Sequence, residues 1–359
     1  MNSRFNFVGE VSIPQDMDKF FREKEGEKPN TGSASVRFSI KESQQNRGFV
    51  ELFGFKNPTV KTIGLNKEKM DIAWRDRLNP DVIKEVADFK KITIDLGEEF
   101  GGETAFITEY DAVLYLAENL PKVTGKLCVT GDWTKNAYNG NFSDRFTIKR
   151  IYPVANDAKS KLEVNMELFY NTESIDMSDL KDDGKVYANC YVEQYVSKDL
   201  GKQLFPQQVV MSNKLLDMSN PKHEGMWKAN MKHLYDELPK KNKMVHMPWK
   251  GKVVNGAEEV PFDESMLTAA QKEQIEFGLA ELKDFKPRQV FGPKISEIRL
   301  VRPILTGDFA DGVVICEESQ EELEERMFTF AVTEKMDDLL KKAEVVADTA
   351  DDDDEDDLF

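Results

Sequence analysis

The sequence predicts a mainly β fold with added helices (α+β), built as two tandem β-barrels and followed by a disordered acidic tail. Three observations support this expectation. Short segments of alternating apolar and polar residues recur along the chain, which is typical of half-buried strands. The order of strands and helices expected in residues 1–155 recurs loosely in residues 156–311. From Asp348 to Asp357 every residue except Thr349 and Ala350 is acidic, and such a block favours disorder.

The length and composition of the chain limit the classes of protein to which it can belong. Its 359 residues allow two domains. No apolar run is long enough for a transmembrane helix, and the first residues lack the apolar core of a secretory signal. Three cysteines lie far apart, which indicates reduced thiols and not a disulfide framework. We therefore expect a cytoplasmic protein, or one of the host cytoplasm if it is viral, with no membrane partner.

The net charge of −17 is concentrated at one end of the chain. Residues 317–359 contain 18 acidic and 4 basic residues, a net of −14, so the remaining residues carry only −3. Such asymmetry is typical of an interaction tail. A nearly neutral body can still present a basic groove, because the local field matters more than the sum.

The first domain, residues 1–155, begins with alternating strands and contains one well-defined helix. Segments 33–40 and 47–55 flank a polar turn, which predicts a hairpin. A third strand is expected where the segment KNPTVKTIGL resumes after Pro58. Residues 107–121 predict a helix with Thr108 as its cap and Pro121 just beyond its end. Strands are then expected at 125–134 and 144–154.

The second domain, residues 156–311, repeats this order. Strands are expected at 161–170, 185–196, 243–254 and 295–304, with a helix at 226–239 and a helix-rich insertion at 264–286. The repetition predicts an internal duplication, although short strands also resemble one another by chance. Residues 312–347 predict an amphipathic helical segment, and residues 348–359 form the acidic tail.

Strand, strand, strand, helix, strand, strand is the order of the OB-fold, a five-stranded Greek-key barrel. The stretch GKLCVTGDWTKNAYNGNFSDRFTIKRIYPV resembles the last two strands of the barrel in single-stranded DNA-binding proteins. The closing residues Asp356, Asp357, Leu358 and Phe359 resemble the acidic, aromatic-terminated tail of the bacterial and bacteriophage members of that family, except that no proline precedes the Phe. The resemblance implies tandem OB-like barrels that bind single-stranded DNA and a tail that binds partner proteins.

Side-chain alternation in the predicted hairpin places aromatic rings on its outer face. Because neighbouring strand residues point to opposite faces, the apolar set that includes Val50 and Leu52 faces the core. The outward set is then Phe49, Phe53 and Phe55, with Arg37 and Lys41 on the partner strand. Rings stack on any base for ~1–3 kcal/mol each, and basic residues neutralise phosphates.

The strand at 185–196 shows the same asymmetry, with Tyr187, Tyr191 and Tyr195 expected to face outward. These tyrosines are candidate base-stacking residues. The alternative is that they pack against another face of the protein or against helices, since Tyr is also common at protein interfaces.

Two further segments supply candidate DNA contacts. The last hairpin of the first barrel, which oligonucleotides contact in OB-folds, contributes Trp133, Lys135, Tyr138, Phe142 and Arg145. For Trp133 a core position is an equal alternative. The WRDRLNP segment contributes Trp74, Arg75 and Arg77, although a capped surface helix explains that segment as well.

Motifs for catalysis and cofactor binding are absent from the sequence. Its three histidines do not lie at zinc-finger spacing from cysteines, and it contains no phosphate loop, dinucleotide fingerprint or nucleophile elbow. We expect no metal, no cofactor and no enzymatic activity.

The sequence therefore predicts a single-stranded DNA-binding protein of replication, recombination or repair. The tail is expected to compete with DNA and to recruit a polymerase, a helicase or primase, or a nuclease through Asp356, Asp357, Leu358 and Phe359. The alternatives are a replisome adaptor whose barrels bind protein and a DNA-mimicking inhibitor.

Overall fold

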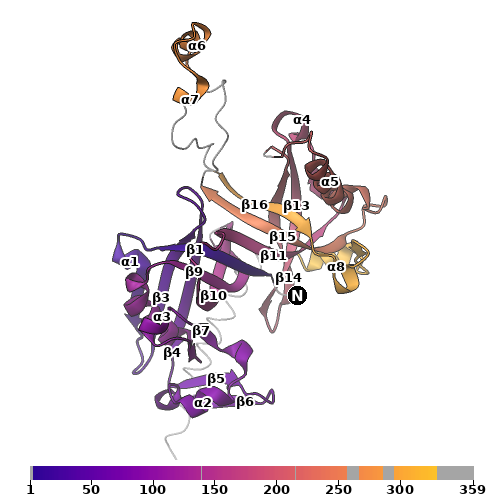
Figure 1. Ribbon diagram of the computed structural model, residues 1–359. Coiled ribbons are helices and arrows are strands. Elements are labelled where there is room, and N and C mark those ends of the chain that lie inside the picture. Colours follow the sequence, from indigo (N-terminus) through magenta and orange to yellow (C-terminus); the bar gives the residue numbers. More distant parts are fainter. Residues whose placement is uncertain (1–2, 139, 215, 257–266, 286–294, 330–359) are drawn as a thin grey trace, which may run out of the picture.

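The computed structural model describes residues 3–138, 140–214, 216–256, 267–285 and 295–329 (Figure 1). It is mainly β, with one large mixed sheet, as the sequence predicts. The acidic tail, residues 348–359, and the second half of the segment 312–347, residues 330–347, lie outside the described residues, so the predictions made for them stay predictions. In the described part of the chain, no helix is both long and apolar enough to cross a bilayer.

Five strands of the first half close into a ring of pairings. They are β1 (Arg4–Ser12), β3 (Gly32–Lys41), β4 (Arg47–Lys56), β9 (Lys126–Tyr138) and β10 (Asn141–Val154). β1 pairs with β3 and β9, β3 pairs with β4, and β10 pairs with β9, all antiparallel. A parallel contact between β4 and β10 closes the ring. The predicted hairpins at 33–55 and 125–154 are thus confirmed.

Five strands of the second half close a ring in the same order. They are β11 (Lys161–Tyr170), β13 (Lys185–Ser197), β14 (Gly201–Ser212), β15 (Val245–Gly256) and β16 (Ile295–Pro303). β11 pairs with β13 and β15, β13 with β14, and β15 with β16, all antiparallel. The closing contact, between β14 and β16, is again parallel.

The two rings repeat each other in register as well as in order. The parallel contact joins Thr147 to Glu51 in the first ring and Arg299 to Val210 in the second. In both rings the pairing between the last two strands shifts by one residue shortly after that contact. The shift follows the residue that faces a glycine, Gly131 on β9 in the first ring and Gly251 on β15 in the second. Matching registers throughout are what an internal duplication predicts, and they assign an equivalent position in one ring to each strand residue of the other.

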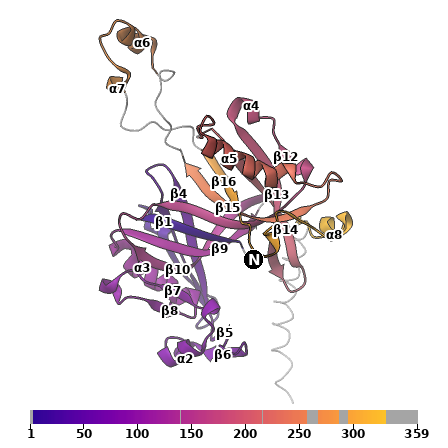
Figure 2. The ribbon, with the colours of Figure 1, turned by 45° about the vertical axis from the view of Figure 1, so that its right-hand side comes forward.

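The rings share an edge where β1 pairs with β11. Phe5 faces Val164 across this junction. These two residues are themselves equivalent, because Phe5 also faces Gly131 on β9 and Val164 faces Gly251 on β15. The two rings are therefore related by an approximate two-fold axis that passes near this pair, and one continuous sheet runs through both (Figure 2).

Two amide side chains fasten each ring to the other. Asn46, in the turn between β3 and β4, donates to the carbonyl of Val253 at 3.2 Å and accepts from the amide of Asn255 at 2.7 Å. Gln194, on β13, accepts from the amide of Lys135 at 2.7 Å and donates to its carbonyl at 3.1 Å. Lys135 and Asn255 occupy equivalent positions, so each of these amides binds the corresponding strand of the other ring, β9 or β15.

An ion-paired carboxylate lies beside the shared edge. Glu163 on β11 is 2.7 Å from the amines of both Lys161 and Lys250. Burial by itself would raise the pKa of Glu163, but hydrogen bonds from the two lysines outweigh burial and lower it.

The helices differ between the rings. α3 (Glu109–Asn119) begins at Thr108, whose hydroxyl accepts from the amide of Asp111, and buries five residues against the first ring. α5 (Pro221–Met231) begins earlier than the predicted 226, because Asn220 caps it and Pro221 occupies its first turn. α5 buries no residue fully, and the π-turn that follows it places Leu234 in the core.

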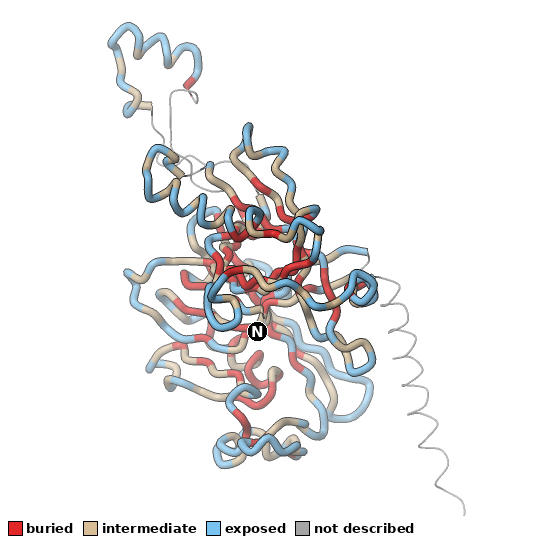
Figure 3. Tube along the Cα trace, turned by 90° about the vertical axis from the view of Figure 1, so that its right-hand side faces the viewer, coloured by how far each residue is buried: buried red, intermediate tan, exposed pale blue. Residues whose placement is uncertain are grey.

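Smaller elements surround the rings, and Figure 3 shows the buried residues concentrated inside them. Helices α6 and α7 of the predicted insertion lie apart from both rings (Figures 1 and 2). The remaining strands and α-helices are α1 (Met17–Phe20), β2 (Phe21–Glu25), β5 (Thr59–Ile63), β6 (Lys69–Ala73), α2 (Pro80–Glu85), β7 (Ile92–Ile94), β8 (Thr104–Phe106), β12 (Ile175–Asp176), α4 (Leu180–Asp183), α6 (Ala269–Glu276), α7 (Leu282–Phe285), β17 (Val314–Ile315) and α8 (Gln320–Glu325).

The last described residues pack on the second ring. The amide of Leu204 donates to the carbonyl of Arg326 at 2.7 Å, and the amide of Phe328 donates to the carbonyl of Leu204 at 2.9 Å. The ring of Phe328 stacks on Phe205 at 4.3 Å between centroids and meets Phe142 edge-on at 5.9 Å. The chain therefore leaves its described part close to where the two rings meet.

Candidate nucleic-acid interface

The outer face of β4 carries three exposed aromatic rings. Phe49, Phe53 and Phe55 are 41%, 42% and 62% exposed, whereas Val50 and Leu52 between them are almost completely buried. The predicted alternation is therefore confirmed. Gly54 points inward against α3, and a Cβ added there would lie 2.1 Å from the amide nitrogen of Tyr110. This close approach of α3 holds β4 in place with its rings toward solvent.

Basic side chains lie among these rings. The guanidinium of Arg37 on β3 is 5.5 Å from the centre of the Phe49 ring, a cation–π geometry. Arg145 on β10 forms an ion pair with Glu51 on β4. Arg47, at the start of β4, and Lys41, at the end of β3, face each other across the hairpin and are half-buried.

Three hollows lie next to one another along this face, and together they are called the groove. The first, of about 690 Å³, lies between the two rings. The second, of about 890 Å³, follows β3 and β4 and shares Arg37, Phe49 and Arg145 with the first. The third, of about 660 Å³, shares Phe53 with the second and reaches Phe55. The three hollows therefore follow one another across the first ring through shared lining residues.

The middle of this groove is strongly basic. Among the residues that line the second hollow, Glu51 is the single acid, and the bases are Lys19, Arg22, Arg37, Arg47 and Arg145, which leaves a formal charge of +4. The nearly neutral body therefore concentrates positive charge where exposed rings also gather. Phosphate neutralisation and base stacking need this combination.

Sequence reasoning missed several basic residues of the groove. Lys19 and Arg22 come from the α1–β2 segment, Arg47 from the start of β4, and Lys61 lines the third hollow. Arg47 is the first residue of the segment 47–55, and the alternation that turns Phe49 outward also turns Arg47 outward, so a sequence signal for it was available. The other three come from segments that only folding brings to this face.

Trp74 and Arg77 fill structural positions. The Arg77 guanidinium donates two hydrogen bonds of 2.9 Å to the carboxylate of Asp111, and it stacks on Trp74 at 4.0 Å. Trp74 is half-buried and lines the third hollow, where one of its faces is taken by Arg77. Arg75 is exposed, 3.6 Å from the carboxylate of Asp76. Of these three predicted contacts, Trp74 alone lies on the groove.

The β9–β10 hairpin splits its predicted contacts between core and surface. Trp133 is 2% exposed and donates to Asp144 at 3.0 Å, so the structure places it in the core, the alternative that the sequence left open. The Lys135 amine is also buried, 2.8 Å from Asp144. Tyr138, near the tip, is exposed outside the three hollows, whereas Phe142 and Arg145 line the cleft between the rings.

The second ring does not reproduce the aromatic and basic face of the first. By register, the positions of Arg37, Phe49, Phe53 and Arg145 are taken there by Tyr187, Gln208, Ser212 and Glu297. Tyr191 lines the cleft between the rings. Tyr195 is exposed, but it lines a separate hollow with Ser3 and Asp132. The three tyrosines therefore do not form one stacking surface.

The cysteines have the properties of inert thiols. Cys128 and Cys190 are buried, and burial raises the pKa of both. Burial likewise raises the pKa of Cys316 to about 11. Within the described ranges, no group of three or more His, Cys, Asp or Glu side chains is arranged to hold a metal ion.

Comparisons with known proteins give little beyond these observations. No family model matches the sequence, and no curated protein matches it. Among solved structures, the chain is similar to a deletion mutant of the single-stranded DNA binding protein from Thermus aquaticus, with 10% identity over 74% of this chain and 96% of that chain. The TM-score is 0.27, which is too low to carry an argument about fold or function.

Proposed function

We propose that this protein binds single-stranded DNA along the groove of its first ring. The observation that carries the proposal is the coincidence, on one face, of three exposed phenylalanines with a hollow of formal charge +4. Rings accept any base by stacking, and the arginines neutralise phosphates, so binding is tolerant of sequence and sensitive to salt.

The strand pairings support an OB-like Greek-key barrel for each ring. Five strands close with the first beside the fourth and the third parallel to the fifth, and a helix lies between the third and the fourth in both rings. The OB-fold is a five-stranded Greek-key barrel, and oligonucleotides are among the ligands that its members bind. We infer two tandem barrels, residues 1–155 and 156–311, with the strand held mainly by the first.

The acidic tail is proposed to compete with DNA for the same groove. Residues 348–359 are strongly acidic, and the groove is basic. Phe328 contacts Phe142, which lines the cleft between the rings. The 18 residues between 329 and 348 allow a span of at most about 65 Å when extended, a length that allows the tail to reach the groove. DNA would displace it and leave Leu358 and Phe359 to partner proteins.

Titration with labelled oligonucleotides tests the DNA-binding proposal. Fluorescence anisotropy at low salt is measured with single-stranded DNA, double-stranded DNA and RNA of equal length. We expect the single strand to bind most tightly and its affinity to fall as salt is raised. If no nucleic acid binds at low salt, the DNA-binding proposal is wrong and the adaptor hypothesis takes its place.

Two altered tails test the proposed competition and recruitment. A chain ending at Ala347 is expected to bind single strands more tightly than the full chain, because the competing acids are gone. Equal affinities would rule out competition. Phe359→Ala is expected to leave DNA binding intact and to weaken the binding of replication or recombination proteins, and loss of both would contradict the proposed division of roles.

A further inference from the structure

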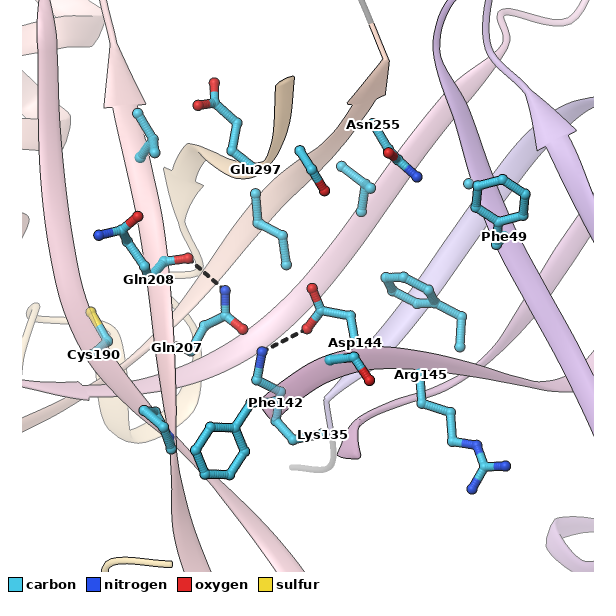
Figure 4. A pocket seen from close by; sticks show the side chains of 18 of the residues that line it. Phe49, Lys135, Phe142, Asp144, Arg145, Cys190, Gln207, Gln208, Asn255 and Glu297 are labelled. Carbon is cyan, nitrogen blue, oxygen red and sulfur yellow. Dashed lines mark hydrogen bonds and ion pairs between the residues drawn. The ribbon is translucent and has the colours of Figure 1, made fainter. Parts of the chain in front are cut away.

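The cleft between the two rings has two unlike walls (Figure 4). The first ring contributes the Phe49 ring with Arg37 and Arg145. The second ring contributes Tyr191 and four amide side chains, Asn189, Gln207, Gln208 and Asn255. The volume of the cleft, about 690 Å³, falls within the ~300–1,000 Å³ typical of pockets that bind small molecules.

The duplicated register explains why the two walls differ. Gln207 and Gln208 on β14 occupy the positions equivalent to Gly48 and Phe49 on β4. Where the first ring presents an aromatic face, the second therefore presents amides. A base that enters between them meets a stacking surface on one side and hydrogen-bonding groups on the other.

The charge of the cleft favours a base over a phosphate. Its lining contains three bases, Arg37, Lys135 and Arg145, and three acids, Glu51, Asp144 and Glu297, so the formal charges cancel. The adjoining hollow carries +4. A bound strand is accordingly expected to lay its phosphates along the basic hollow and to turn a base into the neutral cleft.

One amide oxygen in the cleft has no partner. Gln207 is 6% exposed, and its Nε2 donates to the carbonyl of Gln208 at 2.5 Å. Its Oε1 is buried and accepts no hydrogen bond. Figure 4 shows this amide in the middle of the cleft, between Gln208 and Lys135. A buried acceptor without a donor is unfavourable, and an N–H group from a ligand relieves it.

We propose that the cleft binds one base of the strand through its exocyclic amino group, which donates to Oε1 of Gln207. This inference rests on the proposed function, because the base belongs to the strand bound in the groove. Cytosine carries an amino group at the ring position where thymine carries a carbonyl oxygen. The protein is therefore expected to prefer cytosine to thymine.

Oligonucleotides of dC and dT with equal length, bound to the full chain, provide the test. A single hydrogen bond of ordinary strength predicts a Kd about 2- to 10-fold lower for dC. Gln207→Met keeps the length of the side chain and removes the acceptor, so we expect the preference for dC over dT to be lost. Gln203→Met is the matched control, because Gln203 is buried on the same strand and bonds to Leu200 outside the cleft.

A modified oligonucleotide makes the test independent of protein folding. N4,N4-dimethylcytosine has no N–H donor, so the unmodified chain is expected to bind it no better than dT. If dC and dT bind equally to the unmodified chain, or if either Gln207→Met or the dimethylated base keeps the preference, the inference is overturned while DNA binding stands. If neither oligonucleotide binds, the proposed function itself fails.

Discussion

Replacing Phe53 by alanine removes an aromatic ring from the middle of the groove. Phe53 lines both the second and the third hollow, and it meets Phe55 edge-on at 4.7 Å between ring centres. Its side chain is 42% exposed on the outer face of β4, so its loss leaves the core of the ring intact. A stacked base contributes ~1–3 kcal/mol, which corresponds to a Kd about 5- to 150-fold higher for Phe53→Ala.

Anisotropy titration with a labelled dT oligonucleotide measures this change. The slope of log Kd against log salt should stay constant, because a phenylalanine neutralises no phosphate. Phe89→Ala is the matched control, since Phe89 is 65% exposed on the same domain and lines none of the three hollows. The reasoning is refuted if Phe53→Ala folds normally and binds as tightly as the unmodified chain, or if Phe89→Ala weakens binding equally.

Three further predictions concern charge, the junction of the rings and pH. Arg37→Ala should reduce the slope of log Kd against log salt by about 0.7, which is the contribution of one phosphate contact on a single strand. An unchanged slope would contradict a phosphate contact by Arg37. Asn46→Ala leaves two backbone groups of β15 unpaired, so urea unfolding should report a loss of about 1–3 kcal/mol. Gln44 is exposed in the same turn, so Gln44→Ala should change the free energy of unfolding little. If both variants lose the same free energy, the stabilising role of the Asn46 hydrogen bonds is refuted. The pKa of Glu163 is lower in the folded protein than its ordinary value of 4.5. The ion pairs of Glu163 therefore stabilise the protein fully at pH values above 4.5, and this stabilisation is lost as the pH falls through the folded-state pKa. Glu163→Gln should therefore lower the free energy of unfolding at neutral pH and make that free energy fall less steeply in acid. If urea unfolding gives the same pH profile for the variant and the unmodified chain, the stabilising role of the Glu163 ion pairs is contradicted.

Local patterns in the sequence predicted several parts of the structure correctly. The outward set on β4 followed from the two-residue period of a strand, which depends on backbone geometry alone. Thr108 was recognised as a cap because its side chain bonds within its own turn. The same period located eight of the ten ring strands in order. It missed β1 and β14, and the strand predicted after Pro58, β5, pairs with β6 in a separate sheet outside the first ring.

The roles of several candidate DNA-contacting side chains could not be decided from the sequence, because those roles depend on distant residues. Arg77 is held by Asp111, which lies 34 positions further along the chain, so the WRDRLNP segment by itself did not distinguish a DNA contact from a structural ion pair. For Trp133 the sequence left a core position and a DNA contact equally open. The core position depends on Asp144, which comes from the neighbouring strand β10 and accepts a hydrogen bond from the indole. The tyrosines of β13 alternate as predicted, but Tyr191 and Tyr195 line different hollows.

The sequence by itself determined most of the ring strands, which face of β4 carries the rings, and where the net charge of the chain lies, because each depends on neighbours within a few residues. Only the tertiary structure decided that the first ring, and not the second, presents a basic aromatic groove. That difference appears when positions about 150 residues apart are matched by register, and when Lys19, Arg22 and Arg145 converge on one hollow. Such convergence depends on strand pairing over long distances, which local patterns do not specify.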